Sequence, residues 1–452
     1  MYAHQHWSSK LVFILATVGF SVGLGNIWRF PYMAGENGGG AFVIIYLGCV
    51  VLISIPIVMA ELAMGRRGGM TPAATFKKLA AAENASNYWW LAGALAVLTV
   101  FLIITYYCVI GGWTLHYAWL AFSGELAGID SSSAQIVYDD LLANPLLMMF
   151  WQMMFIVLNI VIVARGLHGG IERAVKILMP VFFTLLLVLA GYALIRGDAA
   201  RGLTFLFQPD FSRVSFQTGI DAMGQAFFSV GVGMAVMMTY GAYLSRDTRI
   251  PRTSAIIALA DTAVALIAGI AIFPFVFAQG MEPGEGVGLV FVTLPVAFAA
   301  MGDGGGFVAI VFFSLLCVAA LTTSIAVFEV LVSWGEEHGR PRSKTALTAG
   351  VVCWIVGLTT VFSFNEAANF RPLAMIPGYE DATMFNIVDK VTATIGLPLG
   401  GLLVAVFVGH ALSRDHIAEE LGLKPDSRTF RIWCFLIRWP IPLMIGTLIF
   451  LT

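Results

Sequence analysis

Residues 19–42 read GFSVGLGNIWRFPYMAGENGGGAF, an apolar helix that is interrupted at once by Gly23, Gly25, Asn26 and Pro31. In the hydrocarbon core of a bilayer, every backbone N–H or C=O left without a partner costs several kcal/mol. A helix that breaks at membrane depth is therefore tolerated where the freed groups line a cavity and bind a ligand. The stretch predicts a binding site within the membrane, close to the start of the chain.

The composition is that of an all-α polytopic membrane protein. Of the 452 residues, 59% are hydrophobic and only 12% are charged, whereas soluble domains carry about 25% charged residues. Apolar runs of about 20 residues recur, and each suits a helix that crosses a bilayer. The Gly- and Pro-rich segment 282–302 is expected to form a re-entrant outer loop instead. The eleven predicted spans are residues 11–33, 41–64, 88–121, 146–164, 171–195, 217–243, 254–279, 307–333, 346–363, 383–412 and 430–451.

The distribution of Lys and Arg predicts a cytoplasmic N-terminus, because cytoplasmic loops of membrane proteins carry an excess of these residues. With that orientation, 18 of the 25 Lys and Arg residues fall in inner loops. The outer segments 122–145 and 280–306 have none. Segment 196–216, which contains three Arg residues, is the exception.

Other functional classes find no support in the sequence. The net charge is −2, and nothing indicates a nucleic-acid partner. The five cysteines lie apart in apolar segments, without the spacing of a transition-metal site. No HExxH motif, and no GxSxG motif with a partner, predicts a membrane enzyme. A passive channel needs a continuous pore, whereas a broken helix favours an occluded site.

A second interrupted helix lies in the sixth predicted span, where residues 225–233 read QAFFSVGVG. Interrupted helices at matching positions of two halves indicate an inverted repeat with a binding site at the bilayer midplane. We therefore expect a single transporter domain over residues 1–452. Its parts are a first repeat at about 8–196, a second repeat at about 215–412 and an additional helix at about 430–451.

Four segments resemble motifs of the neurotransmitter:sodium symporters: NIWRFPY (26–32), GENGGGAF (35–42), GIERAVKILMP (170–180) and LTTSIAVFEV (321–330). The similarity covers nearly the whole chain, and the bacterial amino-acid branch that includes the leucine transporter looks most similar. It implies the leucine-transporter fold, a 5+5 inverted repeat with helices 1 and 6 broken. It also implies a multi-pass protein of the bacterial inner membrane that works by alternating access. The common form of the family has twelve spans, so this chain resembles the shorter eleven-span members, and its oligomeric state stays open.

The first break suggests a site for a carboxylate. The amides of Leu24 and Gly25 lose their helical partners, and the helix that follows points its positive N-terminal end at the gap. Tyr107 taken alone is typical of a core aromatic, but the resemblance makes its hydroxyl a donor to the substrate. Monoamine-transporting members have an aspartate at the position of Gly23, so we expect this substrate to bring its own carboxylate.

The resemblance assigns an apolar pocket to the substrate side chain. Because the pocket has no charged residue, it favours neutral, hydrophobic L-amino acids. Gly231 leaves room for a large side chain, whereas the bulk of Phe20 opposes it. The remaining pocket residues are Ser21, Ile103, Phe227, Phe228, Ser229, Met234, Thr323 and Val327.

Sodium prefers hard oxygen ligands, and the resemblance implies two sodium sites around the breaks. Adjacent threonines in a membrane helix more often bond back to the preceding turn, so Thr322 and Thr323 are weak evidence by themselves. The first site comprises the carbonyl of Ser21, the side chains of Asn26, Ser229 and Asp261, and the substrate carboxylate. The second comprises the carbonyls of Gly19, Val22 and Ala319 and the hydroxyls of Thr322 and Thr323.

Asp261 lies in the apolar run 256–273, where an acid is costly and indicates a function, unless it is paired structurally. Chloride-dependent relatives have an asparagine at this position and a serine one turn later, where this chain has Ala265. We hypothesise that Asp261 both ligates sodium and supplies the negative charge that chloride supplies in those relatives. Chloride is then not required for transport.

The resemblance also predicts gates on both sides of the site. Arg29 and Asp389 would pair through water as an outer gate, with Phe228 as an aromatic lid over the substrate. On the inner side, Trp7 matches the family's gate tryptophan, and Glu337 aligns with its acidic partner.

Features on the inner side leave alternatives open. Glu336, next to Glu337, is a second candidate for the acidic partner of the inner gate. His4 replaces the arginine that the family has near its N-terminus. Gly170 and Pro180 bracket a segment of the fifth span that the resemblance suggests can unwind. A helix start followed by a proline kink explains the same residues equally well.

These features predict a sodium-coupled symporter that imports neutral, hydrophobic L-amino acids. Uptake of another small zwitterion, such as glycine, a betaine or a β-amino acid, is the alternative. The expected partners are the amino acid, sodium ions and the lipid bilayer.

Overall fold

The computed structural model describes residues 6–280 and 288–451, and this part of the chain is helical, with one isolated bridge between Gly39 and Pro209. Nine helices in it are long and apolar enough to cross a membrane. They are Gly40–Gly68, Asn87–Ser123, Pro145–Val163, Leu167–Arg196, Ile250–Ala278, Gly305–Glu337, Arg342–Phe362, Met384–Ala411 and Arg428–Leu451. The expectation of an all-α polytopic membrane protein is therefore confirmed.

The first span is broken, as the sequence predicts. Helix α1 (Lys10–Ser21) begins at Ser9, whose side chain accepts a hydrogen bond from the Val12 N–H, and ends after Ser21. The chain resumes as a π-helical turn from Gly25 that leads into α2 (Phe30–Glu36). The two halves are bent by 54°.

The sixth span is broken as well. Helix α11 (Phe216–Val230) begins with a capping box of Ser215 and Thr218 and ends at Gly231, and α12 (Val236–Ala242) follows. Three of the five intervening residues have positive φ: Gly231 at 71°, Gly233 at 80° and Ala235 at 58°. Glycine adopts this conformation without a Cβ clash, so the two glycines permit a break of this shape.

The fifth span keeps its helix through the bracketed segment. A π-helical turn (Leu167–Glu172) follows Gly166, which has φ 84°, and α9 (Arg173–Arg196) continues without interruption through Pro180. In this conformation the segment that the family resemblance would unwind is wound.

Only part of the predicted re-entrant loop 282–302 can be compared, because residues 281–287 lie outside the described residues. Residues 289–299 form a short apolar helix that ends with α14 (Leu294–Ala299).

The other helices complete the bundle. The spanning ones contain α3 (Gly40–Cys49), α4 (Ile55–Gly68), α6 (Trp90–Ser123), α8 (Pro145–Val163), α13 (Ile250–Ala278), α15 (Gly305–Glu337), α16 (Arg342–Phe362), α17 (Met384–Lys390), α18 (Leu397–Val406), α20 (Arg428–Arg438) and α21 (Pro440–Leu451). The connecting ones are α5 (Pro72–Ala82), α7 (Ser131–Ala143), α10 (Ala199–Phe207) and α19 (Arg414–Leu421).

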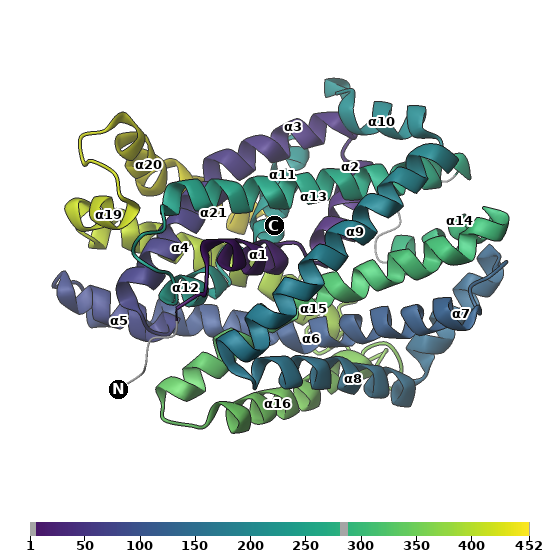
Figure 1. Cartoon of the computed structure of the whole chain (residues 1–452), viewed down its shortest axis with the longest axis horizontal. Helices are drawn as coiled ribbons and strands as arrows, with labels where there is room; N and C mark the ends of the chain where they lie inside the picture. Colours follow the sequence, from purple (N-terminus) through teal and green to yellow (C-terminus); the bar gives the residue numbers. More distant parts are fainter. Residues whose placement is uncertain (1–5, 281–287, 452) are drawn as a thin grey trace.

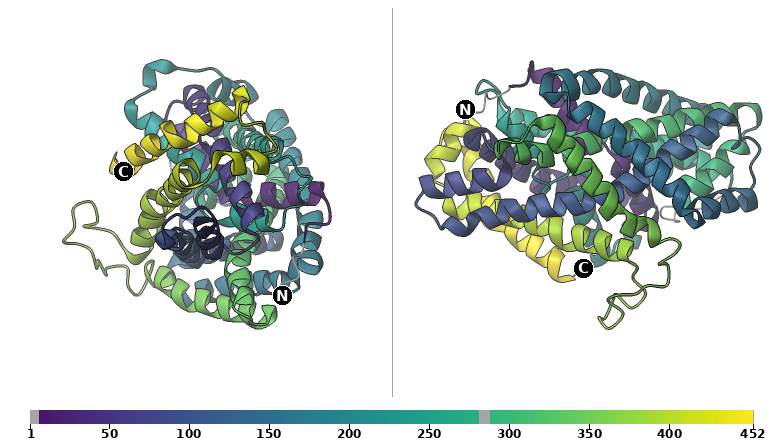
Figure 2. Two further views of the ribbon diagram at one scale, coloured as in Figure 1. Left: turned by 90° about the vertical axis from the view of Figure 1, so that its left-hand side faces the viewer. Right: turned by 90° about the horizontal axis from the view of Figure 1, so that it is seen from below.

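The broken helices lie inside the bundle (Figure 1). Helix α1 packs against α15, α13 and α9, and α12 packs against α4. Helices α20 and α21 lie on the outside of the bundle, and the turns of residues 364–383 between α16 and α17 project away from it (Figure 2). The packing thus places both breaks away from lipid, where freed backbone groups can face a cavity.

A close approach at Gly233 provides a test of the second break. A Cβ at Gly233 would lie 2.3 Å from the Leu397 carbonyl oxygen, and its φ of 80° is strained for other residues. We predict that Gly233→Ala lowers the free energy of unfolding by at least about 2 kcal/mol, measured by thermal unfolding in detergent. Gly224→Ala in α11 is the control, because its Cβ would meet no atom within 4 Å. Equal melting temperatures for the two variants would contradict this packing.

Candidate functional site

The break in the first span opens a small cavity at the centre of the bundle. The residues that line it come from α1 and its break, from α6, from α11 and its break, and from α15. They are Phe20, Ser21, Gly23, Leu24, Gly25, Ile103, Ile104, Tyr107, Phe228, Ser229, Gly231, Met234, Thr323 and Val327. Of the predicted pocket residues, Phe227 alone is absent, because its ring lies beside Gly401.

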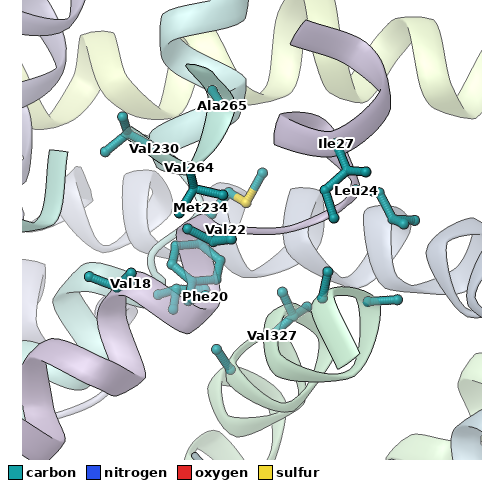
Figure 3. Packing of buried hydrophobic residues seen from close by; sticks show 14 of the residues in the cluster. Val18, Phe20, Val22, Leu24, Ile27, Val230, Met234, Val264, Ala265 and Val327 are labelled. Atoms are coloured by element: carbon teal, nitrogen blue, oxygen red, sulfur yellow. The ribbon is translucent and has the colours of Figure 1, made fainter. Parts of the chain in front are cut away.

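The cavity is tightly packed at its glycines. Figure 3 shows Phe20, Val22 and Met234 together at the break. A Cβ at Gly231 would lie 2.4 Å from the Phe20 ring. Phe20 therefore occupies the room that Gly231 provides in this conformation.

The Tyr107 hydroxyl lies at the first break. Within residues 6–280 and 288–451 it is buried and makes no hydrogen bond of good geometry, although the Thr323 side chain and the Leu24 amide lie close to it. A Cβ at Gly23 would lie 3.3 Å from this hydroxyl. A buried hydroxyl without a partner is costly, so Tyr107 and the Leu24 amide form a place where a bound carboxylate can satisfy both donors.

Asn26, Ser229 and Asp261 form a buried polar cluster where the two breaks meet α13. Asn26 donates to the Asp261 carboxylate at 2.8 Å and to the Ser229 hydroxyl at 3.2 Å. Ser229 in turn donates to the other Asp261 oxygen at 2.6 Å. The side-chain oxygen of Asn26 is buried and has no hydrogen-bond partner in the described part of the chain. A carboxylate, a hydroxyl and a free amide oxygen are the hard ligands that suit a sodium ion.

The predicted second sodium site brings α1 and α15 together. A Cβ at Gly19 would lie 3.4 Å from the Cβ of Thr322, so the two helices meet there. The Thr323 hydroxyl donates to the Phe20 carbonyl at 3.0 Å. The Thr322 hydroxyl bonds back to the Val318 and Ala319 carbonyls of its own helix, each at 3.0 Å. In this conformation Thr322 makes the ordinary helical contact of a membrane threonine.

On one side of the cavity, Arg29 lies over Phe228. Its guanidinium carbon is 4.4 Å from the centre of the ring. Arg29 and Asp389 interact electrostatically but form no direct ion pair in the described part of the chain. Arg29, Phe228 and Asp389 thus lie close together, and their roles as an outer gate and an aromatic lid stay a prediction.

On the other side, the segment before α1 docks against the end of α12. The Trp7 indole N–H donates to the Tyr240 carbonyl at 3.1 Å, and its backbone N–H donates to the Tyr243 carbonyl at 3.2 Å. Glu337 instead accepts a hydrogen bond from Thr71, in the loop between α4 and α5. No contact between Trp7 and Glu337 appears among the described residues, and His4 lies outside them.

An ion pair that sequence reasoning did not single out, between Glu329 and Arg342, lies beside Tyr243, whose ring packs against Trp7. Glu329 is fully buried and pairs with Arg342. The Tyr243 hydroxyl donates to Glu329 at 2.9 Å, and Arg342 also contacts Glu336 at 2.7 Å. A role for Glu329 could have been predicted from the sequence, because it is an acid within an apolar run.

Three further polar residues were missed. Glu61 in α4 accepts a hydrogen bond from the Gly233 N–H at 2.9 Å and so satisfies a backbone group that the second break exposes. Gln225 donates to the Gly25 carbonyl at 3.3 Å, at the first break. The Tyr46 hydroxyl lies 3.3 Å from that of Ser229. A role for Glu61 could have been predicted, because it is an acid within the apolar run 55–65 (IPIVMAELAMG).

Two broken helices around a buried polar cluster and an apolar cavity define a secondary transporter of the leucine-transporter fold. The model of the sodium:neurotransmitter symporter family matches residues 4–139 and 143–451. The chain belongs to this family, whose members are sodium-dependent transporters of the membrane and not enzymes.

Relatives and a solved structure agree with the assignment. The chain is 34% identical to the sodium-dependent transporter YhdH of Bacillus subtilis, covering 97% of this chain and 95% of the relative. It is 35% identical to a sodium-dependent transporter of Haemophilus influenzae, with coverage of 98% and 96%. The crystal structure of MhsT in complex with L-phenylalanine is similar over 99% of both chains, with a TM-score of 0.89 and 40% identity. The predicted family and fold are confirmed.

The polar cluster leads to a prediction about sodium. Ser229→Ala removes a hydroxyl that contacts both Asn26 and Asp261. We expect it to raise the half-saturating sodium concentration about tenfold, since a hydrogen bond to a charged group is worth about 1.5–3 kcal/mol. Sodium-dependent thermal stabilisation measures this. Ser254→Ala is the control, because Ser254 is also buried but its hydroxyl has no hydrogen-bond partner in the part of the chain that the structure describes. Wild-type sodium dependence in both variants would contradict a sodium ligand at Ser229.

Proposed function

We propose that the protein imports neutral, hydrophobic L-amino acids together with sodium bound at two sites, without a requirement for chloride. The N-terminus faces the cytoplasm of a bacterial cell, as the distribution of Lys and Arg favours. Two inverted repeats, residues 8–196 and 215–412, alternate the exposure of one central site. The observation that carries the proposal is the Tyr107 hydroxyl, which has no hydrogen-bond partner among the described residues and lies in an apolar cavity beside the Asn26–Ser229–Asp261 cluster.

The polar end of the cavity favours a substrate with a carboxylate. Tyr107 and the Leu24 amide offer donors at the break, and Gly23 supplies no acid to meet the amine of a monoamine. A Cβ at Gly23 would lie 2.6 Å from the Thr323 hydroxyl, so there is no space for a longer side chain in this conformation. The substrate carboxylate would also reach the sodium at Ser21 and Asn26, which couples the two ligands.

The rest of the cavity favours an apolar side chain. Ile103, Ile104, Met234 and Val327 line it, and none of its lining residues is charged. Burying a charged side chain there would leave that charge unpaired. The similarity to MhsT, which was solved with L-phenylalanine, supports the same substrate class.

The geometry around Asp261 supports independence from chloride. Its carboxylate accepts from Ser229 at 2.6 Å, and the Tyr46 hydroxyl lies 3.3 Å from Ser229. The Asp261 carboxylate therefore already accepts from the Ser229 hydroxyl, which would otherwise be free to donate to an anion. Ala265, one turn along α13, is buried and offers no hydrogen-bond donor.

One observation favours the second candidate, a small zwitterion such as glycine, a betaine or a β-amino acid. Phe20 fills the space beside Gly231 and narrows the cavity. A competition series against sodium-dependent binding of radiolabelled L-phenylalanine, using amino acids of increasing size, separates the two candidates. Stronger competition by large apolar side chains supports the proposal, and competition by glycine or betaine alone contradicts it.

The role of Tyr107 gives a direct test of carboxylate binding. Tyr107→Phe keeps the ring and removes the donor, so we expect amino-acid affinity to fall about 10- to 100-fold, measured by equilibrium binding in sodium. Tyr117→Phe is the matched control, since Tyr117 lies on the same helix but outside the cavity, and its buried hydroxyl also has no hydrogen-bond partner among the residues described. Loss of affinity in both variants, or in neither, would show that Tyr107 does not hold the substrate.

Replacement of the anion tests the role of Asp261. We predict equal initial rates of sodium-driven uptake in chloride and in gluconate, because the Asp261 carboxylate supplies the charge. Proteoliposomes loaded with potassium gluconate allow the measurement. A strong requirement for external chloride refutes this part of the proposal, and it leaves the sodium and amino-acid parts standing.

A further inference from the structure

The last predicted span begins with a helix that has three different faces. Along α20, Phe430, Trp433 and Ile437 are buried against the bundle. Ile432 and Phe435 point outward and are 50% and 60% exposed. A helix with apolar residues both inward and outward at the start of a membrane span lies between the protein and the lipid.

The third face of α20 carries a stripe of positive charge. Arg431 and Arg438 are seven residues apart, which places them on one side of the helix, two turns from each other. Cys434 lies between them and is close to both Arg438 and Arg414, the first residue of α19. Three arginines from two helices thus converge on one region.

These arginines line a pocket of about 210 Å³ between α20, the start of α19 and the end of the preceding span. The Trp439 ring forms part of the wall and is held edge-on against His410, with ring centres 5.8 Å apart. In the described part of the chain, no acidic side chain forms an ion pair with Arg414, Arg431 or Arg438. The pocket therefore has an excess of positive charge, although the guanidinium carbon of Arg414 lies 6.0 Å from the centre of the Phe430 ring.

We propose that this pocket binds the phosphate of an anionic phospholipid, with the acyl chains lying along the outward face of α20. Arginine suits a phosphate because its planar fork of donors matches the phosphate oxygens. The exposed Ile432, Phe435 and Trp439 give the acyl chains an adjacent apolar surface. Trp is typical of the depth at which phosphates meet hydrocarbon.

A lipid fits this site better than a free phosphate ion does. A free ion would use the arginines alone and would gain nothing from the apolar residues beside them. The pocket is also separate from the transport cavity, since the two share no lining residue. Lipid binding here therefore does not depend on which substrate is transported.

Native mass spectrometry of the full-length protein tests the proposal, with phosphatidylglycerol and phosphatidylcholine as probes. The pocket variant combines Arg414→Gln, Arg431→Gln and Arg438→Gln. The control variant combines Arg246→Gln, Arg249→Gln and Arg252→Gln, which removes the same charge from exposed positions that do not line the pocket. Sodium-dependent stabilisation checks that each variant is folded.

We expect wild type and the control variant to retain one phosphatidylglycerol, and the pocket variant to bind it at least tenfold more weakly, since each basic residue adds about 1 kcal/mol of attraction to anionic lipid. Inorganic phosphate should not displace the lipid. Displacement by millimolar phosphate would make this an anion site and overturn the lipid assignment. Equal retention of phosphatidylglycerol by the two triple variants would also overturn it. So would retention of phosphatidylcholine by the wild type that equals its retention of phosphatidylglycerol. If the pocket variant does not fold, the single variants Arg431→Gln and Arg246→Gln are compared by the same criteria.

Discussion

The hydrogen bonds that join Asn26, Ser229 and Asp261 are the interaction on which the site depends. All three side chains are buried, and an isolated carboxylate at such a place would be strongly disfavoured. The cluster therefore exists only if the first span, the sixth span and α13 meet there. Because removal of one partner from a buried cluster leaves the others unsatisfied, the cluster fixes the relative position of these helices. It also supplies the oxygen atoms that a cation needs, so the same contacts serve fold and function.

The breaks themselves are stabilised by residues that are far from them in sequence. The Gly233 N–H, which the second break exposes, donates to Glu61 in α4, and the Gly25 carbonyl accepts from Gln225 in α11. Each break is thus satisfied by a polar side chain from another helix, as the membrane interior requires. An element whose backbone bonds depend on neighbouring helices can change conformation when those helices move. This property suits a transporter that must open to each side in turn.

The sequence predicted the architecture well because the determining signals are local. Apolar runs of membrane length, two glycine-containing interruptions and the motif around Asn26 predict the spans and both breaks. Features that depend on packing could not be predicted. That the Phe20 ring fills the space beside Gly231 depends on how the first broken helix packs against the second. That Glu337 binds Thr71, whereas Glu329 pairs with Arg342, depends on how helices far apart in sequence approach each other. The aligned position of an acid does not reveal its partner.

The central claim is that one central site couples sodium to an amino acid. Reciprocal titration tests it most directly: the dissociation constant of L-phenylalanine is measured across a series of sodium concentrations, and that of sodium across a series of L-phenylalanine concentrations. The account predicts that each ligand tightens the other by the same factor, because the carboxylate and Asn26 share one ion. L-phenylalanine binding that is equally tight in sodium and in potassium would contradict it.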